Sequence, residues 1–276
     1  MAINRKKTHT RKEVNEMEIG HIVSTMDNQN IDRLIKKMKL ATRSIIVNQT
    51  NKFTFDSLTV DNLRHDVYSF NERGVGLSRN NGLMRSNFDV TIMSDDDMEY
   101  IESYEKIISN AYRKHPDADM IVFNVKIHEK NAVRMPVKKN GRVHIFNCLR
   151  YGTVTFTFKT ESVRNKKIYF SLLFGGGSRY SGGEDTIFIW DCIKSGLKVY
   201  SIDTVIANVY NDDSTWFKGY TDEYFIDRGA LFGELSKRWA KLLCLQFALR
   251  KRKLFKDRKN WMEAYRLMVN GIMEIC

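Results

Sequence analysis

Long apolar runs are missing from this chain of 276 residues. Runs such as Ile45–Val47 and Leu242–Leu245 are far shorter than the roughly 20 residues that a membrane-spanning helix needs. Residues 1–20 are charged and polar, so we expect no secretory signal. We therefore expect a cytoplasmic protein, with peripheral attachment to the inner face of the cell membrane as an open alternative.

Cysteine and proline are also scarce. The four cysteines form no CxxC pair, which argues against a disulfide framework or a zinc cluster and fits a reducing compartment. With only two prolines, the chain has no proline-rich linker. We expect one large domain with a basic arm over residues 1–17 and a helical tail over residues 227–276.

Positive charge is abundant and concentrated near the C-terminus. The formal net charge is +12, and ten Lys or Arg residues but one acid lie between Lys237 and Lys259. Leucines and Trp239 recur among them at spacings of three and four, which is typical of an amphipathic helix. Three interpretations stay open: a helix docked on the domain with a solvated basic face, a helix on an anionic membrane surface, or a nucleic-acid site. The apolar stripe disfavours the third, and we expect no nucleic-acid partner.

Short strands alternate with helices along the first half of the chain, which predicts an α/β fold with a mostly parallel central sheet. The expected strands are His21–Thr25, Ser44–Val47, Asp66–Phe70, Asp89–Met93 and Met120–Ile127. Helices are expected from Ile31, capped by Asn28 or Asn30, from about Leu77 to Arg85, and after Asp97.

The second half is less regular. Val143–Phe146 and Val154–Phe158 read as strands, and Phe174–Gly183, with five glycines, as a flexible loop. A helix is expected from Glu184 to about Ser195, followed by a strand over Lys198–Ile206.

Three adjacent carboxylates, Asp95, Asp96 and Asp97, follow an expected strand. Their charges repel one another, and Mn²⁺ or Mg²⁺ together with a substrate diphosphate would relieve that repulsion. Asn48 and Gln49 follow another strand, and ligands gather at the carboxyl ends of strands in open α/β sheets. The alternative is a solvated acidic turn that caps a helix starting at Met98.

Other candidates are weaker when taken singly. Arg79 follows a glycine turn and could meet a base or a phosphate, or form a surface ion pair. Glu184 and Asp185 open a helix after the glycine loop, so a general base and a helix cap are both possible roles. Trp216 could stack on a sugar or belong to the core.

Taken together, these segments resemble family 2 glycosyltransferases, inverting enzymes with the GT-A fold. His21–Asp27 (HIVSTMD) is similar to their first strand and loop, and Gly74–Leu83 (GVGLSRNNGL) to the pattern G-L-S-x-A-R-N-x-G-L. Ser94–Asp97 (SDDD) is similar to the D-x-D motif, and Gly183–Phe188 (GEDTIF) to G-E-D-x-x-F/L. The resemblance runs from about Glu18 to Ile206, with a GT-A domain expected over residues 18–226. Ser214–Gly229 also resembles a bacterial surface-polysaccharide subgroup.

The resemblance implies that a sugar moves, with inversion, from a nucleotide-sugar, expected to be a UDP-sugar, to a hydroxyl of a saccharide or lipid-linked saccharide. Asp185 would be the base, and a divalent metal would meet Asp97 and Asp95. Glu184 and Trp216 would contact the acceptor. The expected nucleotide contacts are Thr25, Asn48, Arg79, Asp95 and Asp96, where Asn48 stands in for a family aspartate that meets the base.

Two alternatives of other classes stay open at this stage. One is a metal-dependent phosphoryl or nucleotidyl transferase acting on nucleic acid, which would also use carboxylates and a basic surface and should show a steep salt dependence. The other is a non-catalytic binding protein, in which the aspartate triplet is a capped turn with no metal-dependent affinity for nucleotides.

Overall fold

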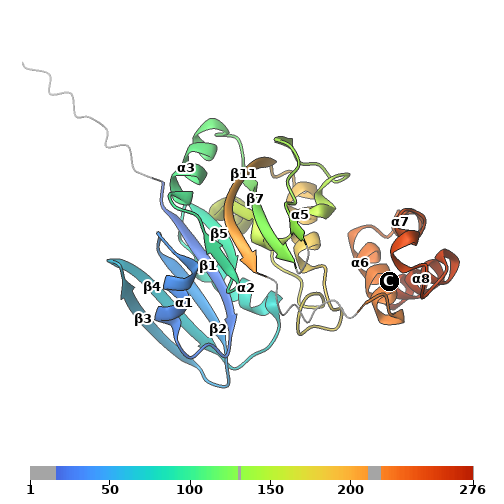
Figure 1. The fold of residues 1–276 in the computed structure, drawn as a ribbon, viewed down its shortest axis with the longest axis horizontal. Helices are drawn as coiled ribbons and strands as arrows, with labels where there is room; N and C mark the ends of the chain where they lie inside the picture. The colour runs from blue at the N-terminus through green and yellow to red at the C-terminus, as the bar shows by residue number, and fades with distance from the viewer. Residues whose placement is uncertain (1–16, 130–131, 211–218, 276) are drawn as a thin grey trace, which may run out of the picture.

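The computed structural model describes residues 17–129, 132–210 and 219–275. Within these ranges, helices pack on an eleven-stranded mixed sheet (Figure 1). The strands are β1 (Ile19–Met26), β2 (Ser44–Gln49), β3 (Thr54–Val60), β4 (Leu63–Phe70), β5 (Val90–Asp95), β6 (Met98–Tyr100), β7 (Met120–Glu129), β8 (Ala132–Arg134), β9 (Gly141–Arg142), β10 (Phe156–Lys159) and β11 (Val199–Tyr210). The α-helices are α1 (Ile31–Met38), α2 (Val75–Arg85), α3 (Tyr104–Lys114), α4 (Thr160–Asn165), α5 (Glu184–Lys194), α6 (Asp222–Leu235), α7 (Ala240–Phe255) and α8 (Trp261–Ile275).

The strands run in the order β3-β4-β2-β1-β5-β10-β7-β11-β6. The neighbours β4, β2, β1 and β5 are mutually parallel, as are β7 and β11, whereas β10 lies antiparallel between β5 and β7. The register pairs Thr25 with Asn48 and Ser24 with Asp95. The carboxyl ends of β1, β2 and β5 therefore meet at one edge of the sheet, and the expected α/β fold with a mostly parallel sheet is confirmed.

Successive side chains of the central strands pack into two separate hydrophobic cores, one on each face of the sheet. Ile22 belongs to the cluster that also contains residues of α2 and α5, while the next residue, Val23, belongs to the cluster with residues of α1 and α3. Because neighbouring residues of a strand point to opposite faces, both faces of β1 are covered by helices. Asn30 caps α1 by accepting a hydrogen bond from the Arg33 backbone N–H, as expected.

The structure differs from the sequence-based expectations at three elements. The expected helix after Asp97 forms as α3 but starts only at Tyr104. The chain directly after the triplet forms β6, because Met98 and Tyr100 are buried and pair antiparallel with β11, so the alternative of a turn that caps a helix from Met98 is wrong. Val143–Phe146 is not a strand: the pairing with β11 is made by β9, just before it, and the Phe146 side chain is fully exposed. The hairpin strand β3 was not predicted, because its residues are mostly exposed and carry little apolar signal.

The C-terminal helices α6, α7 and α8 lie together beyond α5, at the opposite end of the molecule from β3 (Figure 1). Their buried residues belong to the same core cluster as those of α5 and the neighbouring face of the sheet. The expected boundary between residues 226 and 227 falls inside α6. No helix in the described part of the chain is long and apolar enough to cross a membrane.

Candidate functional site

The aspartate triplet lies where β5 ends and turns into β6. Asp95 is the last residue of β5, and Asp96 and Asp97 form the turn. The Thr25 hydroxyl, from the end of β1, donates a 2.5 Å hydrogen bond to the Asp96 carboxylate. The register of β1 and β5 thus brings two of the sequence-predicted nucleotide contacts together.

One carboxylate oxygen of Asp97 has no partner in the described part of the chain. Its Oδ1 atom is buried and has no hydrogen-bond partner among the described residues. Burial, followed by the negative charges of Asp95 and Asp96, raises the pKa of Asp97 to about 7. A buried carboxylate without a partner is costly, so the arrangement fits a bound cation.

Arg79 of α2 joins the triplet to the start of α5. Its guanidinium is buried and donates to both carboxylate oxygens of Asp95, at 3.0 and 3.1 Å, and to Glu184 Oε1 at 2.7 Å. Burial alone would lower the pKa of Arg79, but the two carboxylates outweigh it and raise the pKa. Arg79 is therefore no surface ion pair: it is a permanent positive charge between two predicted functional segments.

Two glycines of the GVGLSRNNGL segment allow α2 to bring Arg79 to this place. A Cβ at Gly76 would collide with the Ser171 carbonyl oxygen, and one at Gly82 with the Ile22 side chain of β1. Asn80, the residue after Arg79, holds the segment at Phe170 against α2. It donates to the Phe170 carbonyl at 2.9 Å and accepts from the Phe170 N–H at 2.8 Å. These glycines permit close packing, and Asn80 fixes the neighbouring chain.

Glu184 and Asp185 begin α5 and differ in their surroundings. Glu184 is buried and engaged by Arg79 and by the Gly183 N–H, at 3.1 Å. Asp185 accepts the Thr186 N–H on Oδ1 at 2.6 Å, while no described residue donates to its Oδ2, which faces Gly152. Burial and the charge of Glu184 raise the pKa of Asp185 to about 6, although Arg79 opposes the shift. Asp185 is the carboxylate with a free oxygen.

The glycine-rich segment before α5 is a loop, as the sequence predicted, and part of it is packed. The Gly175 N–H donates to the Tyr180 carbonyl and the Tyr180 N–H to the Leu173 carbonyl, both at 2.9 Å. The rings of Phe174 and Tyr180 are buried and stack 4.7 Å apart. Gly175 has a φ of +105°, and a Cβ there would lie 2.9 Å from the Glu184 carboxylate, so glycine lets this turn press against the site.

Both the oxygen and the nitrogen of the Asn48 side-chain amide are hydrogen-bonded to the loop after β1. Its Oδ1 accepts the Asn28 N–H at 3.2 Å and its Nδ2 donates to the Asn28 carbonyl at 2.8 Å. In this structure Asn48 therefore holds the loop that would lie beside a bound base. Its predicted contact with the base would require these hydrogen bonds to be shared or exchanged.

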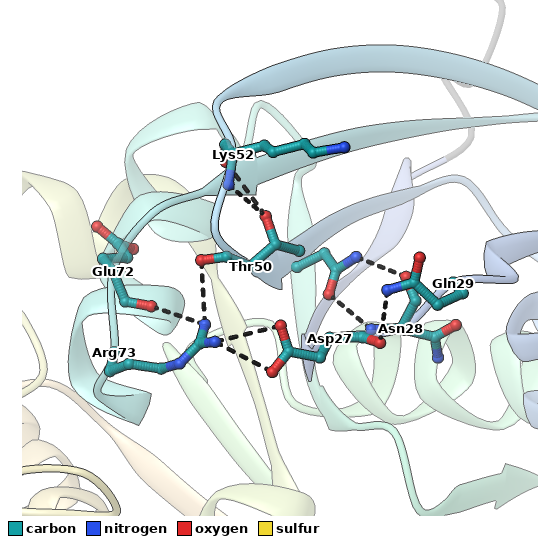
Figure 2. Close-up of polar contacts among 8 residues, drawn as sticks. Asp27, Asn28, Gln29, Thr50, Lys52, Glu72 and Arg73 are labelled. Carbon is teal, nitrogen blue, oxygen red and sulfur yellow. Dashed lines mark hydrogen bonds and ion pairs between the residues drawn. The ribbon is translucent and has the colours of Figure 1, made fainter.

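Sequence reasoning overlooked Arg73, which connects the loops around this edge of the sheet. Figure 2 shows its guanidinium between Asp27 and the backbone of Thr50 and Glu72. It contacts the Asp27 carboxylate at 3.0 and 3.2 Å and the Thr50 carbonyl at 3.1 Å. Arg73 lies just before Gly74, in the turn that opens α2, and that position was the signal available in the sequence.

The structure thus brings together most of the predicted site. Arg79 contacts Asp95 and Glu184, Thr25 contacts Asp96, and Asp97 and Asp185 are chain neighbours of these groups. Trp216 lies outside the described residues, as do residues 1–16 of the expected arm.

No cluster of three or more His, Cys, Asp or Glu in the described ranges could hold a metal by itself. Mg²⁺, however, commonly uses one or two carboxylates with waters and a substrate phosphate, so the residues fit such an ion.

These features define a GT-A-like glycosyltransferase fold, as the sequence resemblance implied. The chain is similar to the crystal structure of S. aureus TarS residues 1–349 in complex with UDP-GlcNAc, with a TM-score of 0.65, 14% identity, and coverage of 93% of this chain and 82% of that one. It is also similar to the complex of the same TarS fragment with UDP (TM-score 0.63, 14% identity, 94% and 83% coverage). A third similar structure, of TarS itself, has a TM-score of 0.62 at 14% identity, and this chain covers 50% of it.

No family model matches the sequence, and no curated protein matches it. The likeness to TarS at 14% identity shows the fold alone.

Proposed function

We propose that this chain is a metal-dependent inverting glycosyltransferase that moves a sugar from a UDP-sugar to an acceptor hydroxyl. The observation that carries the proposal is the buried ion-pair chain Asp95–Arg79–Glu184, which places the end of β5 beside the start of α5. UDP and UDP-GlcNAc are bound by TarS, the structure of similar fold, which supports a UDP-sugar as the donor class. The nucleic-acid transferase and the non-catalytic alternatives gain no comparable support.

The donor end of the site would be formed by Thr25, Asp95 and Asp96 around the nucleotide, with Asp97 and Asp95 holding Mn²⁺ or Mg²⁺. When bound, that ion would supply positive charge next to the diphosphate leaving group. Arg79 adds a fixed positive charge close to the same carboxylates. Asn48 and Arg73 would border the base through the loops that they hold.

The acceptor end would be formed by Glu184 and Asp185. Asp185 would accept the proton from the acceptor hydroxyl on Oδ2 while the oxygen attacks the face of the sugar opposite the diphosphate. Its raised pKa, about 6, leaves it ionised at neutral pH yet more basic than an ordinary aspartate. Glu184 would contact the acceptor through Oε2, which Arg79 does not hold and which accepts the Gly183 N–H. No covalent sugar–enzyme intermediate is needed for inversion.

Calorimetric titration of UDP tests the donor half of this proposal. With Mn²⁺ present we expect binding that weakens at least about tenfold when chelator removes the metal or when Asp97→Asn removes a ligand charge. A matched control is Asp203→Asn, which also removes one carboxylate but is exposed and lies near the start of β11, seven residues before Tyr210, whose N–H donates to the Asp97 carbonyl. Equal affinity for UDP in all conditions would refute the metal assignment.

A further inference from the structure

The helix α7 has two different apolar faces. Ala240, Cys244 and Ala248 are fully buried and face the rest of the molecule. Leu242 and Leu249 point away from that face, with 55% and 42% of their side chains exposed. Leu243 packs against the core, so the leucines of α7 are divided between two surfaces, and Leu242 and Leu249 form the outward stripe.

Another large apolar side chain accompanies this stripe. Trp239, directly before α7, is 52% exposed. Leu254 is 56% exposed but lies about 140° round the helix from Leu249, away from the stripe. The Arg238 guanidinium lies 5.3 Å from the centre of the Trp239 ring. Exposed tryptophan next to arginine is an arrangement suited to a membrane–water interface, where the ring is buried among lipid and the cation stays in water.

Cations surround the apolar stripe, and they lack ion-pair partners within the described residues. Those without an ion pair there are Lys237, Arg238, Lys241, Arg250, Lys251, Arg252, Lys253, Lys256 and Arg258. Lys259 is the member of this segment that is paired, with Asp222 at 2.5 Å. A surface on which unneutralised cations and exposed leucines alternate is complementary to an anionic lipid headgroup layer.

We propose that the outward face of α7, with Trp239, binds the surface of an anionic membrane. We call this face, formed by Trp239, Leu242, Leu249, Arg250 and Lys253, the α7 outer face. Leucine and tryptophan enter the headgroup region, and the lysines and arginines neutralise lipid charge. Nucleic acid fits less well, because phosphate binding gives no reason for exposed leucines between the cations.

The position of α6 connects this surface to the candidate site. A Cβ at Gly183, the residue before Glu184, would lie 2.9 Å from the Leu231 side chain of α6. The start of α5 therefore rests directly on the helical unit that carries the α7 outer face. If the proposed function holds, membrane binding would bring the acceptor end of the site to a lipid-linked saccharide, but the lipid contact itself does not rest on that function.

Vesicle flotation with the whole chain tests the proposal without donor or acceptor. We expect binding to mixed phosphatidylcholine–phosphatidylglycerol vesicles, little binding to pure phosphatidylcholine, and weakening with salt. The double variant Arg250→Gln/Lys253→Gln should bind the anionic vesicles about 10- to 30-fold more weakly, since each such cation contributes about fivefold near an anionic surface. The control Lys138→Gln/Lys139→Gln removes two exposed cations elsewhere and should bind like the parent.

The apolar part is tested by Leu242→Ser/Leu249→Ser, which should reduce vesicle binding about tenfold. Val133→Ser/Met135→Ser is its control, because these two apolar residues on and beside β8 are also exposed. All four variants alter exposed side chains, so unchanged melting temperatures verify their folding. Equal vesicle binding by the parent and both α7 variants would overturn the proposal, as would salt-sensitive binding to RNA or DNA without binding to vesicles.

Discussion

Arg79 holds two carboxylates of the candidate site in place. A buried guanidinium with carboxylates on two sides keeps Asp95 and Glu184 in place. Removing one member of such a buried ion pair commonly costs about 3–5 kcal/mol, because it leaves an uncompensated buried charge. The arginine is therefore structural and electrostatic at once, and substitutions there cannot separate folding from catalysis.

A substitution at Asp185 can separate an effect on catalysis from an effect on folding. Asp185→Asn keeps the shape and the capacity to accept the Thr186 N–H, but the amide cannot take a proton from a hydroxyl. We expect sugar transfer to fall by about 10²–10⁴-fold while UDP affinity is retained. In the parent protein, transfer should also decline as the pH falls below about 6, because protonation removes the base.

Steady-state transfer and UDP titration on the same Asp185→Asn preparation check this prediction. The exposed variant Asp203→Asn serves as a control for the loss of one charge. Near-parental turnover of Asp185→Asn would show that Asp185 is not the base.

At the scale of elements, the sequence predicted what depends on local pattern. Apolar runs located β1, β2, β5 and β7, and the glycine turn located α2. It did not predict β6, because three residues after an acidic turn become a strand only through pairing with β11, over 100 positions away in the chain. The same limit applies to Arg79 and Glu184, which are 105 positions apart. The family resemblance placed Arg79 at the nucleotide and Glu184 at the acceptor, but it did not predict their contact.

The strand β1 contains a buried histidine that makes the fold sensitive to acid. His21 lies 2.9 Å from the Ser94 hydroxyl and 2.7 Å from the Tyr104 hydroxyl. Burial, with a smaller contribution from His65, lowers the pKa of His21 to about 3. In the unfolded chain the ordinary value is about 6.5. The unfolded state therefore binds one more proton between these values, so stability is full above pH 6.5 and is lost as the pH falls.

We expect His21 to contribute a loss of about 1.4 kcal/mol in the free energy of unfolding per pH unit below 6.5, or about 3 kcal/mol by pH 4.5. Urea denaturation between pH 7 and 4.5 measures it. His21→Gln cannot gain a proton and should show a smaller slope, while the exposed His144→Gln should keep the parental slope. Identical slopes for all three proteins would contradict the assignment to His21.

At the scale of the whole molecule, the C-terminal helices are part of one core with the sheet. Phe225 of α6 and Met268 of α8 belong to the same buried cluster as Ile22 and Phe156 of the sheet. Deleting α7 and α8 would therefore expose core surface of α6. For this reason, point variants on the α7 outer face test membrane binding more cleanly than a truncation.

The helices α6 and α8 are in close backbone contact. The two helices approach so closely that a Cβ at Gly229 would collide with the Met268 carbonyl, and one at Gly271 with the Ile226 carbonyl. Gly229→Ala gains about 1 kcal/mol of helix propensity, but overpacking costs about 1–3 kcal/mol, and here the obstacle is backbone that cannot rotate away. We expect a net loss of about 2 kcal/mol, seen as a melting temperature lower by roughly 4–8 °C. Gly182→Ala is the matched control, because a Cβ there meets nothing within 4 Å. Calorimetry of both variants measures this. A single unfolding transition whose melting temperature is lowered only in Gly229→Ala supports a shared core. An unchanged melting temperature of Gly229→Ala would mean that the two helices separate at no cost in stability.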